Sequence, residues 1–454
     1  MLRLGMTISA GVREAALARF QSLVRVPTVS RLDEAQTDWP QFERFATLLQ
    51  ELYPDLHGAL EREVVAGHAL LYRWAGRAPG PATVLMAHYD VVGVSGENWR
   101  FPPFSATVTG GGGDAEIWGR GVIDDKASLT CILEAAEDAL RAGFTPAHDV
   151  YLALSHNEET LGGGTPAIVA RLTDLGVPVG FVLDEGGIVG ESIFAGLQRP
   201  AVLVGVSEKG TATVRITFAG PGGHASVPPA APVTVRLARA LIRLAERQPE
   251  PFFNEVTRQL LLDIAPYAAG ELCQAAADLR AGDEKSALAH FERVSRDAYA
   301  MVRTTPVATM ISAGHSANVV PGHVSAIINA RVAVGSSVRQ ALVEIAAAID
   351  DPAAAIEVLE SFEPSPVSPS SGPCWDLLTD AITHTYGDVL VTPYVNNGGT
   401  DSRNYAAVCP NVYRFSPFEM TLAERRSIHA VDEHIRVASF YAGIEFYLRL
   451  VGHL

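Results

Sequence analysis

Runs of apolar residues that end in polar side chains recur in the first half of the chain. The segments 83–90 (TVLMAHYD), 149–159 (DVYLALSHNEE) and 180–187 (GFVLDEGG) each have this pattern. Continuous apolar runs are typical of strands that are buried on both faces of a parallel sheet. We therefore predict a mostly parallel sheet in which three strands end in His, Asp or Glu residues.

Helical patterns alternate with these strands. Amphipathic periodicity predicts helices over 12–28 and 40–52, and residues 126–143 predict a helix that stops at Gly143. The alternation indicates an α/β fold, a mostly parallel mixed sheet sandwiched by helices. Ligands of such sheets bind beyond the carboxyl ends of the strands, where the polar residues lie.

The pattern changes after about residue 206, which predicts a second, α+β domain. Residues 210–220 alternate with period two, as an antiparallel strand with one wet face does. Three further strands are expected at 307–314, 323–334 and 354–361. Two helices are expected at 232–247 and 337–350, and a helix-rich stretch covers about 250–303.

We expect the second domain to be an insertion in the first. The segment 364–373 is rich in Pro and Ser, which is typical of a linker that leads back to the first domain. The predicted division is a catalytic domain in two parts, 1–206 and 364–454, with an inserted domain at 207–363. The second part is expected to end in a helix at 436–451.

Composition and charge narrow the classes of partner. The 454 residues are too many for one ordinary core. With 51 acidic and 35 basic residues the net charge is −16, which argues against nucleic acid or an anionic membrane as partner. No stretch reaches the roughly 18 apolar residues that span a bilayer. The start, MLRLGMTISAGVREA, lacks the apolar run of a secretory signal, and the four cysteines form no CxxC pair. We expect a soluble, cytoplasmic protein.

Acids and histidines at the strand ends are the first candidates for chemistry. His88 and Asp90 are two residues apart at a strand end, so their side chains point to the same side. This spacing suits a metal-binding His whose second ring nitrogen is held by a carboxylate. Taken singly, such a pair is more often a structural histidine with its hydrogen bonds satisfied.

Two further segments carry adjacent acids. Asp124 could bridge two metal ions, because a carboxylate has two oxygens, whereas Asp125 beside Lys126 could equally start a helix with a surface partner. Glu158 and Glu159 follow a long apolar run, so a cation or a raised pKa is needed if both are buried. One of them could bind metal while the other acts as general base. An exposed acidic loop is the alternative.

The remaining candidates are individually weak. Asp184 and Glu185 share a strand end, where an ordinary polar end before a glycine turn is the alternative. His429 precedes the last helix, and Glu433 and His434 are expected on a helix surface. In combination, the strand-end residues and His429 form a set of oxygen and imidazole ligands without thiolate. Such a set suits zinc, manganese or cobalt in a hydrolytic site.

In addition, the sequence resembles a known enzyme family over nearly its whole length. The motifs that carry the resemblance are HYDVV (88–92), WGRGVIDDK (118–126), HNEE (156–159), LDEGG (183–187), GGHASVP (222–228), NVVP (318–321), GGTDSRNY (398–405) and IHAVDE (428–433). They are similar to those of the zinc peptidase family of carboxypeptidase S, glutamate carboxypeptidase, aminoacylase, acetylornithine deacetylase and succinyl-diaminopimelate desuccinylase. The branch of carboxypeptidase S and the N-fatty-acyl-amino-acid hydrolases is the most similar.

The resemblance implies a zinc-exopeptidase-like fold with a ferredoxin-like lid and two Zn²⁺ per subunit, with Co²⁺ or Mn²⁺ as alternatives. It makes Glu158 the general base that takes the proton of a metal-activated water, and it makes Asp90 the residue that orients His88. The Asp124–Asp125 peptide bond is expected to be cis. The implied metal ligands are His88, Asp124 as the bridge, Glu159, Asp184 and His429.

The resemblance also assigns roles to residues of the lid. His224 would stabilise the oxyanion of the tetrahedral intermediate, often from across a dimer, and the sequence leaves open whether this chain forms a homodimer through the lid or is a monomer. Asn318, Arg331 and Thr400 would hold the carboxylate of the substrate, for which an arginine is a natural clamp. Position 329 is Asn where many relatives have Asp, which leaves the partner of Arg331 open.

The implied activity is the hydrolysis of an amide bond next to a free carboxylate, in a peptide or an N-acyl amino acid. Two alternatives stay open. An aminopeptidase with a similar metal centre would bind a free amine in place of the carboxylate. A non-catalytic homologue would only bind ligand, and the complete ligand set together with Glu158 argues against it.

Overall fold

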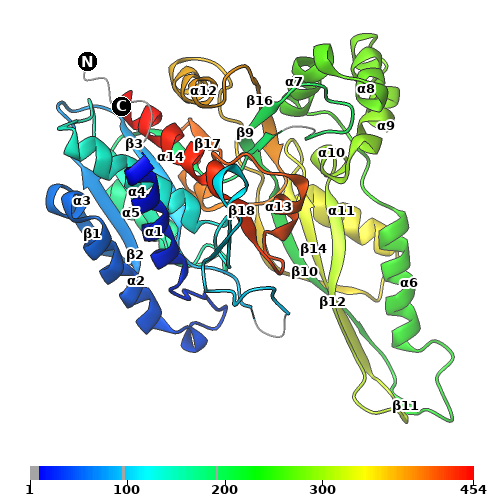
Figure 1. The fold of residues 1–454 in the computed structure, drawn as a ribbon. Coiled ribbons are helices and arrows are strands. Elements are labelled where there is room, and N and C mark those ends of the chain that lie inside the picture. The colour runs from blue at the N-terminus through cyan, green and yellow to red at the C-terminus, as the bar shows by residue number, and fades with distance from the viewer. Residues whose placement is uncertain (1–9, 95–97, 191–192) are drawn as a thin grey trace.

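The fold is seen in a computed structural model that describes residues 10–94, 98–190 and 193–454 (Figure 1). The first nine residues, which make up most of the segment considered for a secretory signal, lie outside the described residues. Within the described chain, a large mixed sheet and a smaller four-stranded sheet each have their own layer of helices.

A nine-stranded mixed sheet forms the centre of the larger part of the molecule. Its strands are β1 (Glu61–Val65), β2 (Ala69–Trp74), β3 (Ala82–His88), β6 (Val150–Ser155), β7 (Val179–Asp184), β8 (Ile188–Gly190), β9 (Ala201–Glu208), β16 (Leu390–Asn396) and β17 (Val412–Arg414). Their order is β1-β2-β6-β3-β7-β17-β9-β16, and β8 pairs with β9. The run from β6 to β17 is parallel, whereas β1 and β2 pair antiparallel at one edge. The α/β sheet predicted from the sequence is confirmed.

Helices cover both faces of this sheet (Figure 1). On one face α4 (Lys126–Arg141) packs against β3, α1 and α14, and on the other α5 (Gly164–Asp174) packs against β1, β2 and β6. Along β3, Leu85 belongs to one core cluster and Met86 to another, so both faces of the strand are buried. This burial explains the continuous apolar run in the sequence. The remaining helices of this part are α1 (Ala10–Val24), α2 (Trp39–Leu52), α3 (Pro54–Ala59), α12 (Pro373–Tyr386), α13 (Leu422–Ser427) and α14 (Val437–Gly452).

The smaller sheet, called the lid sheet below, is antiparallel. Its strands are β10 (Gly210–Ala219), β12 (Thr305–Ala313), β14 (His323–Val332) and β15 (Ala355–Phe362), in the order β12-β14-β10-β15. Helices α6 (Val233–Glu246) and α11 (Val338–Ile349) cover one face and share a separate hydrophobic core with it. Beyond the helices, the strands continue as an arm whose tip is a short ladder of β11 (Gly223–His224) and β13 (Val319–Val320) (Figure 1).

The helix-rich stretch inside the lid sequence packs onto the large sheet. Buried residues such as Leu260, Leu272 and Phe291 belong to the core cluster of the large sheet and not to that of the lid sheet. The helices are α7 (Glu255–Ile264), α8 (Gly270–Arg280), α9 (Glu284–Val294) and α10 (Arg296–Met301).

A third, three-stranded sheet joins the N-terminal and C-terminal segments of the catalytic part. It is made of β4 (Thr107–Thr109), β5 (Glu116–Trp118) and β18 (His434–Arg436), in the order β18-β5-β4. Strand β5 leads into the loop before α4, and β18 leads into α14. Among the described residues, no helix has the length and apolar character that a membrane span requires.

Candidate metal centre

Parallel strands deliver the candidate ligands to one edge of the large sheet. Strands β3 and β6 end together, because His88 is the register partner of Ser155, and β7 runs beside β3. Residues 158–159 follow the end of β6. Asp184 is the last residue of β7, and Glu185 comes directly after it. The loop before α4 supplies Asp124 and the segment before β18 supplies His429, both of which reach the same cluster.

Asp124 lies between the two histidines of this cluster. Its Oδ1 is 2.8 Å from His88 Nε2, and its Oδ2 is 2.9 Å from His429 Nε2. Glu159 Oε2 lies 3.0 Å from the same nitrogen of His429. A carboxylate that turns one oxygen to each of two imidazoles has the arrangement of a bridge between two cations. The Asp124–Asp125 peptide bond is cis, as the family resemblance implied.

The acid that joins His88 and Asp124 is Glu185, whose Oε1 lies 3.5 Å from His88 Nε2. Asp184, the expected ligand, instead accepts a hydrogen bond of 2.8 Å at Oδ2 from the backbone N–H of Ser402. Successive side chains at a strand end point to opposite sides, so only one of the two adjacent acids faces His88. The two groups of possible ligands are His88, Asp124 and Glu185, and Asp124, Glu159 and His429.

Asp90 is buried and holds both His88 and the segment that carries the glutamates. Its Oδ1 is 3.3 Å from His88 Nδ1 and accepts a hydrogen bond of 3.1 Å from the backbone N–H of Glu158. Its Oδ2 accepts a hydrogen bond of 3.1 Å from the N–H of Glu159. Fixing Nδ1 of the imidazole leaves Nε2 directed at Asp124, as in metal-binding histidines that a carboxylate orients.

Crowded acids dominate the electrostatics of the cluster. Burial raises the pKa of Glu158 well above its usual range, His88 opposes this shift, and Glu185 adds to it. Burial also acts on Asp124, but hydrogen bonds from His429 and His88 outweigh it and hold the pKa of that carboxyl well below its usual value. The hydrogen bonds that Asp124 and Glu159 accept from His429 raise the pKa of this histidine to about 10. Buried carboxylates that repel one another are stabilised by cations.

The donors present fit divalent metal ions. Glu159 Oε1 is buried without a hydrogen-bond partner, as expected for an oxygen that a cation would engage. The two groups contain imidazole nitrogens and carboxylate oxygens and no sulfur. Zinc, cobalt and manganese accept such a set.

Glu433 anchors the loop that carries Asp124. It is fully buried, and its Oε1 accepts hydrogen bonds from the backbone N–H groups of Ile123 (2.8 Å) and Asp124 (3.2 Å). Its Oε2 accepts bonds from Gly121 N (3.0 Å) and Arg120 Nη1 (2.7 Å). The expectation of an exposed position on a helix was therefore wrong, because this carboxylate satisfies four donors of a loop about 310 residues away in the chain.

The same correction applies to His434. It begins β18, not a helix, and its ring stacks on Trp118 with the ring centres 4.1 Å apart. The surface partner suggested for Asp125 is also absent: the neighbouring Lys126 is buried, and its Nζ donates to the carbonyls of Val26 (2.7 Å) and Leu23 (3.3 Å).

Of the expected substrate contacts, Arg331 and Thr400 lie beside the cluster. Burial lowers the pKa of Arg331, Arg403 adds to the shift, and Glu208 and Glu158 partly offset it, so Glu158 is within electrostatic reach of Arg331. Thr400 is buried on the loop whose Ser402 binds Asp184.

His224 and Asn318 lie elsewhere, at the tip of the lid arm. His224 is exposed on β11, and its Nδ1 is 2.6 Å from Ser226 Oγ. Asn318 is exposed directly before β13, and its carbonyl accepts a hydrogen bond from the N–H of Ala225. The tip points away from the large sheet (Figure 1), so a single chain in this arrangement brings neither residue to the metal ligands.

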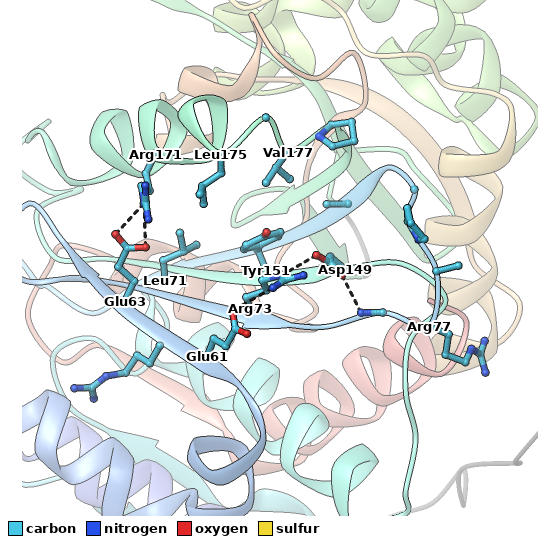
Figure 2. A pocket seen from close by; sticks show the side chains of 18 residues that line it. Glu61, Glu63, Leu71, Arg73, Arg77, Asp149, Tyr151, Arg171, Leu175 and Val177 are labelled. Atoms are coloured by element: carbon cyan, nitrogen blue, oxygen red, sulfur yellow. Dashed lines mark hydrogen bonds and ion pairs between the residues drawn. The ribbon is translucent and has the colours of Figure 1, made fainter.

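An open hollow of about 870 Å³ lies on another part of the large sheet, between β1, β2 and α5 (Figure 2). Arg73 and Arg171 line it, but they pair with Asp149 (2.8 Å) and Glu63 (2.9 Å) respectively. None of the metal-site candidates lines this hollow. Arg73 and Arg171 thus already have acidic partners of their own.

Comparisons with known proteins identify the family of the chain. The model of peptidase family M20/M25/M40 matches residues 84–453. A probable carboxypeptidase S-like 2 of Dictyostelium discoideum is 32% identical over 92% of this chain and 80% of its own. An N-fatty-acyl-amino acid synthase/hydrolase of Danio rerio is 32% identical over 98% of this chain and 86% of its own.

A solved structure shares the fold. The M20 family metallo-carboxypeptidase Sso-CP2 of Sulfolobus solfataricus superposes with a TM-score of 0.70 at 18% identity, over 97% of this chain and 99% of the other. The resemblance deduced from the motifs is thereby confirmed. The chain belongs to peptidase family M20/M25/M40 and is a metal-dependent amide hydrolase.

Proposed function

We propose that this enzyme hydrolyses the amide bond next to a free carboxylate, in an N-acyl amino acid or a short peptide. The observation that carries the proposal is the position of Asp124 between two histidines, with the backbone of Glu158 bound to the same Asp90 that contacts His88. Relatives whose names are carboxypeptidase S-like and N-fatty-acyl-amino acid synthase/hydrolase support this substrate class.

We propose two zinc ions per chain, with cobalt or manganese as substitutes. The ligands of one ion would be His88, Asp124 and Glu185, with Glu185 in the place first expected for Asp184, and those of the other would be Asp124, Glu159 and His429. When bound, such ions supply positive charge that polarises the scissile carbonyl and favours deprotonation of a nearby water.

The protein's own groups divide the remaining work. Glu158 would take the proton of the attacking water and hand it to the leaving amine, a task that a raised pKa suits. Asp90 would keep His88 and the backbone of Glu158 in place through the bonds described above. Arg331 would bind the substrate carboxylate, which sets the scissile bond beside Glu158.

A comparison of the cleavage rates of two kinds of substrate tests the proposed reaction. The zinc-loaded enzyme is expected to cleave N-hexanoyl-leucine and other N-acyl amino acids at least about tenfold faster, in kcat/KM, than their C-terminal carboxamides, because a charge-assisted hydrogen bond to arginine is lost in the carboxamide. Release of leucine, followed by chromatography, measures the rates. Faster cleavage of leucyl-leucinamide than of any N-acyl amino acid would identify an aminopeptidase, and no cleavage of either class would leave a binding protein.

We propose that the lid forms a homodimer that completes the site. Strand β12 is an edge strand of the lid sheet, and its Val307, Met310 and Ile311 are 57%, 66% and 64% exposed. An apolar edge strand favours pairing with another chain. His224 and Asn318 at the arm tip would then reach the metal centre of the second copy, where His224 would stabilise the oxyanion.

Sedimentation of the purified protein tests the dimer. We expect a mass of two 48.3 kDa chains, and we expect Met310→Asp to sediment as one chain with a lower kcat. The exposed Leu32, outside the lid, offers the control substitution Leu32→Asp. A wild-type protein that sediments as one chain at full activity would contradict the proposal.

We also propose a cytoplasmic location, the expectation first drawn from the sequence. All four cysteines, two of them buried, are free thiols, which suits a reducing compartment.

A further inference from the structure

Two arginines from different parts of the molecule border one small space beside Gly399. Arg331 lies on β14 of the lid sheet, and Arg403 lies in the 3₁₀ turn Asp401–Tyr405 of the catalytic part. A methyl group added to Gly399 would lie 3.6 Å from Arg403 Nη1, 3.9 Å from Arg331 Nη1 and 4.0 Å from Glu208 Oε1. The missing side chain of this glycine leaves room that two guanidinium nitrogens and one carboxylate oxygen border.

Neither guanidinium has a carboxylate partner. Within the described part of the chain, no acidic oxygen lies within 4.0 Å of either group. Arg331 Nη1 donates to Thr211 Oγ1 (3.2 Å), and Arg403 Nη1 donates to the carbonyl of Thr400 (2.8 Å). Arg403 Nε is buried and has no partner. Asn329, two residues before Arg331, donates to Thr213 and supplies no charge.

The acid that borders this space, Glu208, is paired with another arginine through its second oxygen. It is buried at the end of β9, and its Oε2 accepts a hydrogen bond of 2.8 Å from Arg414 Nε. The same oxygen accepts bonds from the N–H (3.1 Å) and the hydroxyl (3.0 Å) of Thr400. The hydroxyl proton of Thr400 is therefore engaged, and Thr400 has no side-chain donor left for a substrate.

The cationic groups around this space outnumber the one carboxylate that borders it, Glu208. Burial lowers the pKa of the neighbouring Lys209 to about 7, and the charges of Arg331 and Arg303 act in the same direction. Arginines stay protonated in proteins, so the charges of Arg331 and Arg403 persist. Partly buried cations without a counter-charge are costly unless an anion binds between them.

We propose that Arg403 is a second cationic contact for the carboxylate of the substrate, together with Arg331, and that Gly399 leaves the room for that carboxylate. The inference rests on the proposed function, in which the substrate carries a free carboxylate next to the scissile bond. Two guanidinium groups that converge on one carboxylate can each give it charge-assisted hydrogen bonds. Discrimination against a carboxamide then follows from both arginines.

A purely structural role of Arg403 makes a different prediction. Its guanidinium also lies over the ring of Phe362, 5.0 Å from the ring centre, where the lid strand β15 ends. If Arg403 only held this junction and the carbonyl of Thr400, its loss would weaken binding of carboxylate and carboxamide ligands equally. The difference between the two ligands is therefore the informative quantity.

The experiment measures binding without turnover. Zinc-loaded Glu158→Gln protein is titrated by calorimetry with N-hexanoyl-leucine and with N-hexanoyl-leucinamide. We expect the carboxylate to bind at least about tenfold more tightly than the carboxamide, and we expect an added Arg403→Gln change to remove most of that preference while the carboxamide affinity changes less than about threefold. Arg403→Lys, which keeps the charge, should restore part of it.

Arg77 provides the matched control. It is exposed at the hollow of Figure 2, so Arg77→Gln makes the same change of charge far from the site and should leave the preference intact. An unchanged preference in Arg403→Gln, or an equal loss for both ligands, would overturn the inference. If the enzyme with Glu158 cleaves no N-acyl amino acid while the preference still depends on Arg403, the proposed reaction fails and the inference stands. A parent protein without any preference would overturn both.

Discussion

The Glu158→Gln enzyme is expected to keep its metal ions and to lose between about a hundredfold and ten-thousandfold in kcat, the range that general-base catalysis contributes. Glutamine has nearly the shape of glutamate but cannot accept a proton from the attacking water. Glu158 is outside both groups of possible ligands, so its substitution leaves the ions their donors.

Steady-state hydrolysis of N-hexanoyl-leucine and elemental analysis of the same sample measure the two quantities. Glu51 is exposed on α2, and Glu51→Gln makes the matched substitution away from the site. If Glu158→Gln retained wild-type turnover with its metal bound, the general-base role would be wrong. Loss of metal along with activity would instead make Glu158 a ligand.

The second large effect is expected at Asp124. An asparagine offers only one oxygen to the space where Asp124 presents Oδ1 to His88 and Oδ2 to His429. We expect Asp124→Asn to bind at most one metal ion per chain. We expect its activity to fall by more than the roughly 10–100-fold that loss of a residue supporting a metal ligand costs.

Elemental analysis after dialysis measures the metal content of this variant. Asp114→Asn, at an exposed position, is the control. The same measurement on Asp184→Asn and Glu185→Gln separates the two adjacent acids, because only the true ligand should lower the metal content. An Asp124→Asn protein that retains two ions per chain would rule out the bridge.

The residues at the strand ends could be predicted from the sequence because the apolar pattern that places them lies in a short, continuous segment. A continuous apolar run fixes a strand that is buried on both faces, and parallel strands present their carboxyl ends at one edge. His88, Glu159 and Asp124 meet there as expected. The choice between Asp184 and Glu185 is finer, since it depends on which way the last side chain of β7 turns, and the apolar pattern carries no information about that rotation.

Features that depend on distant partners could not be predicted. The charged Glu433 has the sequence pattern of a surface residue, yet it is buried because it binds the backbone of a loop about 310 residues earlier. Strand β9 was likewise not anticipated, since its pairing with β16 joins segments that are far apart in the sequence. The helices α7–α10 lie within the lid sequence but pack on the large sheet, and contiguity in sequence gives no sign of that.

The lid shows the limit of motif transfer within one chain. The motif around His224 marks a residue with a family role, but the arm holds it exposed and away from the ligands. Arg403 is the opposite case, because its position in the GGTDSRNY motif suggested no role. Its convergence with Arg331 depends on how the lid sheet meets the 399–405 loop, and this contact became visible only in three dimensions.

The central claim, a two-ion amide hydrolase, is tested most directly by metal titration of the enzyme itself. Chelator-treated protein is titrated with zinc while bound zinc and hydrolysis of N-hexanoyl-leucine are followed in parallel. The geometry around Asp124 predicts that turnover is negligible without zinc and reaches its maximum only when about two ions are bound per chain. Full turnover in the metal-free protein, or a maximum at one ion per chain, would contradict it.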